Sequence, residues 1–187
     1  MPSAISINLF QEIDVLDKPL VGIIMGSDSD FSVMEEASKI LENFKVAHEV
    51  LVTSAHRTPE RTRKYVQGAK RRGLRIFIAG AGGAAHLAGV VAAESTLPVI
   101  GVPINSTPLN GLDSLLSTAQ MPGGIPVATV SIGKWGAKNA GLLAVQILAL
   151  ADEKLASQLV KYRKQQAKAV EQKSQKLKTP HASNFKG

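Results

Sequence analysis

The feature that most constrains the fold is an alternation of short apolar runs with longer segments of helical periodicity. The apolar runs, several rich in Val and Ile, are residues 20–26, 48–54, 75–80, 97–103 and 125–133. The helical segments between them are residues 32–44, 59–73, 84–94 and 111–120. Short apolar strands alternating with helices are typical of a parallel sheet covered on both faces. With right-handed crossovers, the pattern predicts an α/β fold, a three-layer α/β/α sandwich around a five-stranded parallel sheet of the flavodoxin-like type.

Two further helical segments, 136–152 and 153–178, follow the fifth run. In the second, Leu155, Leu159 and Tyr162 form a narrow apolar stripe on an otherwise polar, basic helix. A projecting helix of that kind often packs on another subunit. The expected organisation is an N-terminal extension (1–19), a catalytic α/β domain (20–151), an intersubunit C-terminal helix (152–178) and a flexible tail (179–187).

The net charge of +7 is unevenly distributed along the chain. Residues 152–187 hold nine Lys/Arg and three Asp/Glu, a net +6, whereas the first 151 residues hold thirteen and twelve, a net +1. Tyr162 is the one aromatic residue among the basic residues of 152–178, whereas a single-strand nucleic-acid binder would require several on which bases can stack. We therefore expect a solvated basic helix and no nucleic-acid partner.

Composition also bears on compartment and on several kinds of site. The chain contains no cysteine, which excludes disulfides, zinc-thiolate sites and a thiol nucleophile and favours the cytoplasm. No apolar run reaches the roughly 18 residues of a membrane span, and the first residues do not resemble a signal peptide. The expectation is a cytoplasmic protein with no membrane partner.

Unusual sequence follows four of the five predicted strands. The strand ends read "MGSDSD", "TSAHRTP", "AGAGGAAH" and "GVPINS". In an open parallel sheet, ligands bind beyond the carboxyl ends of the strands. The convergence of these four stretches predicts a binding site for a small ligand at that edge.

The first strand end, "GSDSDF" (26–31), permits three interpretations. Ser29 or Asp30 could cap a helix, since their side-chain oxygens accept free helical N–H groups. The same helix start, with its Gly and Ser residues, could bind a phosphate. Asp28 and Asp30 could instead hold magnesium, although the phosphatase pattern places its first Asp directly after the strand. No metal is expected.

The third strand end, "AGAGGAAH" (79–86), formally satisfies a dinucleotide fingerprint. That fingerprint also requires an acidic residue at the end of the next strand, and "LPVIGVP" contains none. No nicotinamide or flavin cofactor is therefore expected. The glycines more plausibly let the backbone close over a small ligand, and His86 either joins that site or satisfies a backbone carbonyl.

The second strand end carries the strongest candidates. His56 and Arg57 are adjacent, just before Thr58 and Pro59, and proline suits a first helical turn. Arginine binds a carboxylate or phosphate through two parallel hydrogen bonds, and a neutral imidazole beside it can transfer protons near pH 7. The alternative is a helix-capping loop with an exposed His-Arg pair.

Taken together, these stretches resemble the class I form of N(5)-carboxyaminoimidazole ribonucleotide mutase. The resemblance rests on "MGSDSD", "SAHRTPER", "IAGAGGAAHLAG", "PVIGVP", "DSLLSTAQMPGGIPVATVSIG" and "NAGLLAVQIL", in the family's order. It implies an isomerase of purine (IMP) biosynthesis that uses no cofactor. In the family scheme a carbamate loses carbon dioxide, which stays trapped until the ring carbon attacks it.

The resemblance also implies roles for individual residues. His56 matches the histidine that protonates the departing nitrogen and then takes the ring proton. Ser27 and Asp30 match substrate contacts, with Asp30 on the ribose, while Arg57, aided by Ser54, matches the phosphate grip. The loop enclosing carbon dioxide and the ring corresponds to Gly82, Gly83, Ala84, His86 and Leu87. Further candidates, several of them expected between subunits, are Ser29, Asp113, Ser114, Gln120, Met121 and Pro122.

By the same resemblance the protein is a homo-oligomer, an octamer, and a separate ATP-dependent carboxyaminoimidazole ribonucleotide synthetase supplies its substrate. Two alternatives remain. A class II aminoimidazole ribonucleotide carboxylase would use free carbon dioxide, but its motifs typically have Lys after the histidine and "GRSNAL" in the third loop. A non-catalytic flavodoxin-like nucleotide-binding module would need none of the histidine geometry.

Overall fold

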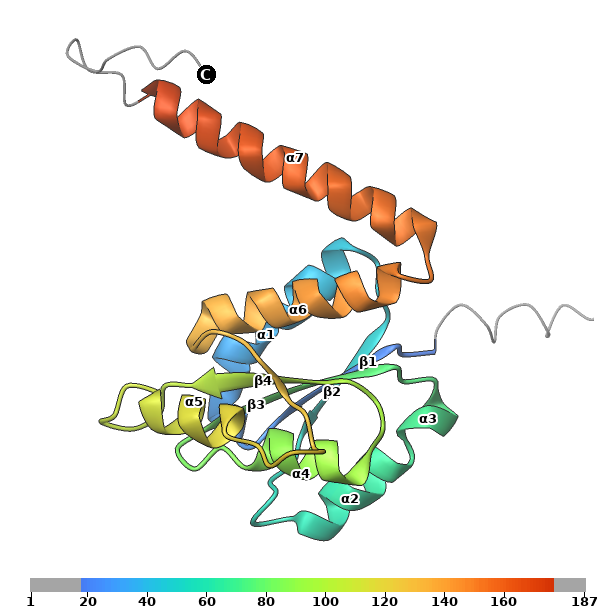
Figure 1. Ribbon diagram of the computed structural model, residues 1–187, viewed down its shortest axis with the longest axis vertical. Coiled ribbons are helices and arrows are strands. Elements are labelled where there is room, and N and C mark those ends of the chain that lie inside the picture. The colour runs from blue at the N-terminus through green and yellow to red at the C-terminus, as the bar shows by residue number, and fades with distance from the viewer. Residues whose placement is uncertain (1–17, 177–187) are drawn as a thin grey trace, which may run out of the picture. The chain divides into compact units, whose positions relative to one another are not determined.

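The computed structural model describes residues 18–176, and its central element is one sheet of five parallel strands (Figure 1). The strands are β1 (Val21–Met25), β2 (His48–Val52), β3 (Ile76–Gly82), β4 (Val99–Ile104) and β5 (Ala128–Thr129). Their order across the sheet is β2-β1-β3-β4-β5. This is the flavodoxin-like order, so the predicted fold is confirmed.

Helices cover both faces of this sheet. They are η1 (Asp28–Asp30), α1 (Phe31–Asn43), α2 (Pro59–Gln67), α3 (Ala69–Arg72), α4 (Leu87–Glu94), α5 (Leu112–Ala119), α6 (Gly133–Ala149) and α7 (Glu153–Lys176). Figure 1 shows α1 and α6 on one face and α2, α4 and α5 on the other. The single helix expected over 59–73 is divided in two at Gly68.

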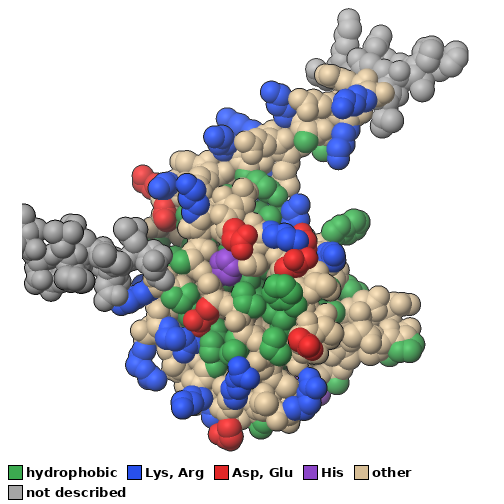
Figure 2. Space-filling model, turned by 180° about the vertical axis from the view of Figure 1, so that it is seen from behind, with side chains coloured by type: hydrophobic (Ala, Val, Ile, Leu, Met, Phe, Trp, Pro, Cys, Tyr) green, Lys and Arg blue, Asp and Glu red, His purple; other side chains and the backbone are tan. Residues whose placement is uncertain are grey.

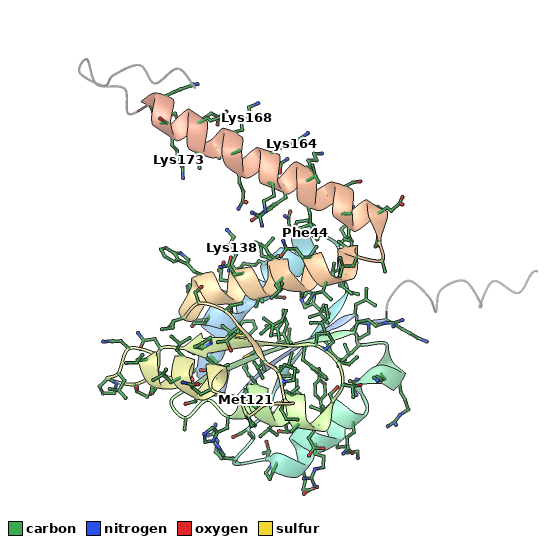
Figure 3. All side chains as sticks on the ribbon, viewed as in Figure 1. Phe44, Met121, Lys138, Lys164, Lys168 and Lys173 are labelled. Carbon is green, nitrogen blue, oxygen red and sulfur yellow. The ribbon has the colours of Figure 1, made fainter. Side chains whose placement is uncertain are left out.

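The central strands form the core. Every residue of β1 and β4 is buried, as are the first five of β3, because helices pack on both faces. Two glycines allow close packing there. A Cβ at Gly80 would collide with Met34, and one at Gly141 of α6 would lie 2.9 Å from the Ala37 carbonyl oxygen of α1. Phe44, labelled in Figure 3, is also buried, just past the end of α1.

The fifth strand is shorter than its apolar run predicts. Only Ala128 and Thr129 pair with β4, followed by one further hydrogen bond from the Val130 N–H to the Gly101 carbonyl. Pro126 has no N–H to donate to a ladder. The positive φ of Gly133, 73°, then begins α6.

Strand register aligns the loops that follow the strands. Met25 pairs with both Val52 and Gly80, so β1, β2 and β3 reach the carboxyl edge at the same level. The Gly26 N–H donates to the Gly80 carbonyl and the Thr53 N–H donates to the Met25 carbonyl. The loops after these three strands therefore emerge side by side, at the switch point between β1 and β3 where ligands bind in such sheets.

The chain divides into two compact units after Val145, within α6. In the second unit, Asp152 caps α7 by accepting the N–H groups of Lys154 and Leu155. Lysines project from several sides of α7 (Figure 3), whereas Lys/Arg and Asp/Glu side chains are interspersed on the body seen in Figure 2. No helix within residues 18–176 is long and apolar enough to cross a membrane. The proposed tail, 179–187, and nearly all of the N-terminal extension lie outside the described residues.

Candidate active site

A cavity of about 310 Å³ opens at the carboxyl edge of the sheet. Its lining comes from the carboxyl ends of the first four strands and the segments that follow them: Gly26, Ser27, Ser29, Asp30, Ser54, Ala55, His56, Arg57, Ala81, Gly82, Ala84, His86, Leu87 and Ser106. Ten of the residues proposed from sequence thus lie around one space. A second cavity, of about 900 Å³, is larger but has no histidine in its lining, so the smaller one is the better candidate for proton-transfer chemistry.

Asp30 is held by a tight turn after β1. Ser27 has extended backbone, its hydroxyl accepts the Ser29 N–H, and Asp30 Oδ2 accepts the Ser27 N–H at 3.1 Å, which completes a capping box. The Asp30 residue is only 6% exposed. Burial raises the pKa of its carboxyl above the ordinary 3.8, while the Ser27 N–H and the nearby Arg57 cation oppose that rise.

Arg57 connects the loop after β2 to the loop after β1. Its Nη2 donates to the Gly26 carbonyl at 2.8 Å, and its backbone N–H donates to Ser54 Oγ at 3.1 Å. The loop itself is stiffened by Thr58, whose hydroxyl accepts the Ser54 N–H and donates to the Ser54 carbonyl. The guanidinium is thus fixed at the cavity with donors left over for an anion.

The two histidines meet across the cavity. His56 Nε2 lies 2.9 Å from His86 Nδ1, and the rings are nearly perpendicular, with centroids 5.0 Å apart. His56 comes from the loop after β2, and His86 is the N-cap residue of α4. One nitrogen of this contact must carry the proton and the other must accept it, so the two rings share a proton position.

The glycine-rich loop after β3 lets backbone approach closely. Gly83 has φ of 61°, in the region that favours glycine. A Cβ at Gly82 would collide with Ser106, which arrives from the loop after β4. The sequence does not single out Ser106 as a site residue, although it is the last residue of the unusual strand end "GVPINS". Gly83 itself does not line the cavity but lies between two residues that do.

Besides Gly83, five candidates lie outside the cavity lining of a single chain. Asp113 Oδ2 accepts the Thr107 hydroxyl at 2.7 Å, a bond that lowers the pKa of the Asp113 carboxyl. Ser114 is fully buried and donates to the Ile104 and Gly111 carbonyls. These two residues shape the loop that carries Ser106. The remaining three are Gln120, Met121 and Pro122, of which Met121 contacts α4 at Gly89 (Figure 3).

Among residues 18–176 no three His, Asp or Glu side chains gather as metal ligands. Asp28 and Asp30, for which magnesium binding was the disfavoured interpretation, have other partners. Asp28 Oδ1 accepts from the Ser27 hydroxyl and from the Ser29 N–H, and Asp30 closes the capping box. Their observed role is to build the turn.

Comparison with known proteins shows the family to which the chain belongs. The model of the AIR carboxylase family matches residues 20–169. The chain belongs to this family. The match covers the whole sheet, the cavity and the first part of α7, and it begins after the N-terminal extension.

Several members of the AIR carboxylase family are closely similar to this chain. N5-carboxyaminoimidazole ribonucleotide mutase of Bacillus subtilis is 57% identical over 160 residues, covering 86% of this chain and 99% of the relative. The protein of the same name from Synechocystis is 63% identical over 145 residues, covering 78% and 81%. The crystal structure of Treponema denticola PurE superposes with a TM-score of 0.77 at 31% identity, covering 86% of this chain and 99% of that one.

Proposed function

We propose that this AIR carboxylase family member converts N(5)-carboxyaminoimidazole ribonucleotide to 4-carboxy-5-aminoimidazole ribonucleotide in purine biosynthesis. The observation that carries the proposal is the meeting of His56, Arg57 and Asp30 with a glycine loop in one cavity. The names of the Bacillus and Synechocystis relatives support this substrate.

In this proposal the phosphate group anchors the ribonucleotide in the cavity. Arg57, positioned by Ser54 and Gly26, grips the phosphate. The buried Asp30 accepts ribose hydroxyls, with Ser27 and Ser29 beside it. The loop of Gly82, Gly83 and Ala84, with His86 and Leu87, surrounds the imidazole ring and the carbon dioxide.

The chemistry then needs one proton, moved twice. His56 protonates the ring-attached nitrogen as its bond to the carboxyl carbon breaks and carbon dioxide is released. The ring carbon attacks that carbon dioxide, and His56 takes the ring proton, which restores aromaticity. Retention in a small cavity keeps the second step intramolecular, so the advantage of proximity is not lost. No metal or organic cofactor enters this scheme.

We place the enzyme in the cytoplasm as a homo-octamer whose substrate comes from an ATP-dependent synthetase. Asp113, Gln120, Met121 and Pro122 then close sites between subunits, and α7 packs against a neighbouring subunit. Ser114, fully buried in its own subunit, supports the loop beside them. The apolar stripe of Leu155, Leu159 and Tyr162 on an otherwise basic helix supports that role for α7.

Substrate choice tests the proposal against its rivals. The purified protein would be incubated with N(5)-carboxyaminoimidazole ribonucleotide and, separately, with aminoimidazole ribonucleotide plus bicarbonate. Product from the first substrate supports the mutase. Product only from the second would make the protein a direct carboxylase, and product from neither would leave a non-catalytic nucleotide-binding module.

A further inference from the structure

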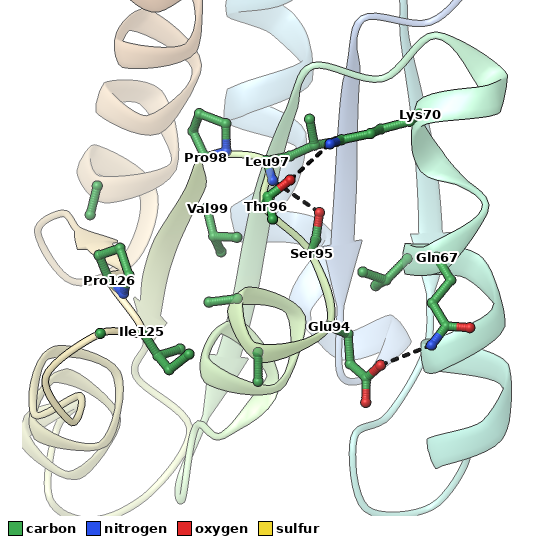
Figure 4. A pocket seen from close by; sticks show the side chains of 15 residues that line it. Gln67, Lys70, Glu94, Ser95, Thr96, Leu97, Pro98, Val99, Ile125 and Pro126 are labelled. Atoms are coloured by element: carbon green, nitrogen blue, oxygen red, sulfur yellow. Dashed lines mark hydrogen bonds between the residues drawn. The ribbon is translucent and has the colours of Figure 1, made fainter.

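The larger cavity lies at the opposite edge of the sheet from His56. Figure 4 shows the side chains that line it. Val99 and Ala128, the first residues of β4 and β5, open into it, so it lies at the amino ends of the strands. Its remaining walls come from the α2–α3 region, the end of α4 with the following residues 95–98, and residues 124–126. Its volume is about 900 Å³, enough for several side chains.

The chemistry of this amino-edge groove favours an apolar occupant. Polar groups at its rim already have partners: Lys70 Nζ donates to Thr96 Oγ1 at 2.8 Å, and Gln67 donates to Glu94 at 3.1 Å (Figure 4). The accessible remainder is mostly apolar, and includes Ala92, Ala93, Leu97, Pro98, Ile125 and Pro126. Covering such a surface removes apolar area from water.

The N-terminal segment leaves the described structure close to this groove. Lys18, the first described residue, contacts Gly73, where a Cβ would lie 3.1 Å from the Lys18 Cβ. Gly73 ends α3, and Lys70 of that helix lines the groove. The Leu20 carbonyl accepts the Arg75 N–H at 2.8 Å, so the chain enters the sheet at the same amino edge.

Reach is ample. The groove begins at β4, two strands from β1, and neighbouring strands are about 4.8 Å apart. The 17 residues before Lys18 could span about 56 Å if extended. A docked segment would therefore need only part of its length to reach the groove and could return along it.

The sequence of that segment is complementary to the groove and its rim. Seven large apolar residues lie along it, five of them in its second half: Ile5, Ile7, Leu9, Phe10, Ile13, Val15 and Leu16. Acidic residues are interspersed: Glu12, Asp14 and Asp17. Exposed cations lie between the exit point and the groove, Lys70, Arg71 and Arg75, and within residues 18–176 none of them forms an ion pair with a carboxylate.

We propose that residues 5–16 dock in the amino-edge groove of their own subunit. Their apolar side chains cover Leu97, Pro98 and Ile125, and their carboxylates face the cations of α3. The segment precedes the family match, which begins at residue 20, so it is an addition to the catalytic core. The inference concerns an edge of the sheet that the proposed reaction does not use.

Thiol labelling tests this directly because the chain contains no natural cysteine. Ala93→Cys places one small thiol in the groove wall. We expect slow reaction with a soluble disulfide reagent in the full chain, and roughly tenfold faster reaction once residues 2–17 are removed, because labelling then requires no undocking. The double variant Phe10→Ser/Ile13→Ser should also accelerate labelling, and it covers the case in which the truncated chain folds poorly.

A matched control is Leu109→Cys, a 61% exposed position beyond the carboxyl end of β4, whose labelling rate should not respond to the same changes. Rapid labelling of Ala93→Cys in the full chain would overturn the proposal. Protection that survives the truncation and rises with protein concentration would also overturn it, since a second copy would then cover the groove. Mutase activity, measured on the same samples, reports separately on the proposed function.

Discussion

His56 Nε2 lies 2.9 Å from His86 Nδ1, although the two residues are 30 positions apart in sequence. The contact exists because β1, flanked by β2 and β3, brings the ends of those two strands level. In this contact one ring nitrogen must donate and the other must accept, so His86 can fix the orientation and tautomer of His56.

His86→Asn is expected to lower kcat by about 10- to 100-fold and to change the shape of its pH profile, because His56 loses a ring with which it shares a proton. Steady-state kinetics across pH would measure both. His48→Asn is the matched control, since His48 lies on β2 outside the cavity lining and should leave the profile unchanged. An unaltered profile for His86→Asn would remove His86 from proton transfer.

Arg57→Lys should raise KM about 10- to 100-fold with a smaller change in kcat. Lysine keeps the charge but cannot both donate to the Gly26 carbonyl and bind a phosphate with two parallel bonds. Arg63→Lys, on α2 and outside the cavity lining, is the matched control for the same exchange of a guanidinium for an ammonium group. Equal KM values for the two variants would contradict the phosphate assignment.

Asp30→Asn should weaken substrate binding while preserving or raising stability. The folded-state pKa of Asp30 is raised above 3.8, chiefly by burial. In the pH window between 3.8 and the raised pKa, the folded state therefore binds more protons than the unfolded state. Its contribution to stability therefore falls as pH rises through this window. Asparagine can still accept the Ser27 N–H but does not ionise.

Thermal unfolding of both proteins at several pH values would measure this effect. The Tm advantage of Asp30→Asn should grow as pH rises from below the window to neutrality. A variant whose Tm falls relative to the parent over that rise would show that the ionised carboxylate stabilises the turn.

Gly82→Ala should destabilise the protein by about 1–3 kcal/mol, because its Cβ would overlap Ser106. Ser106→Gly removes the obstructing side chain, so the double variant should recover much of the loss. Denaturant unfolding of the four proteins gives the coupling energy. Additive losses would show that the close approach of these two loops is not what requires glycine at position 82.

Much of this architecture follows from local sequence. The β-branched runs predicted four strands closely, because buried parallel strands need apolar residues on both faces. The strand-end stretches predicted that His56, Arg57 and Asp30 lie around one cavity, because parallel strands bring their carboxyl ends to one edge.

The remaining features depend on tertiary structure, which local sequence does not show. Nothing in the spacing of His56 and His86 indicates that their rings meet, since that depends on strand order. Ser106 could not be singled out because its place in the cavity depends on the absence of a side chain at Gly82. The fifth strand was overestimated because its apolar residues continue into a loop that begins α6.

The central claim is that His56 moves the proton while Arg57 holds the substrate, and His56→Asn tests it most directly. The variant keeps a polar side chain but cannot transfer a proton. Turnover of N(5)-carboxyaminoimidazole ribonucleotide should fall by about 10²- to 10⁴-fold, with the substrate Kd within about tenfold of the parent value. Turnover that remains within a few-fold of the parent would contradict the account.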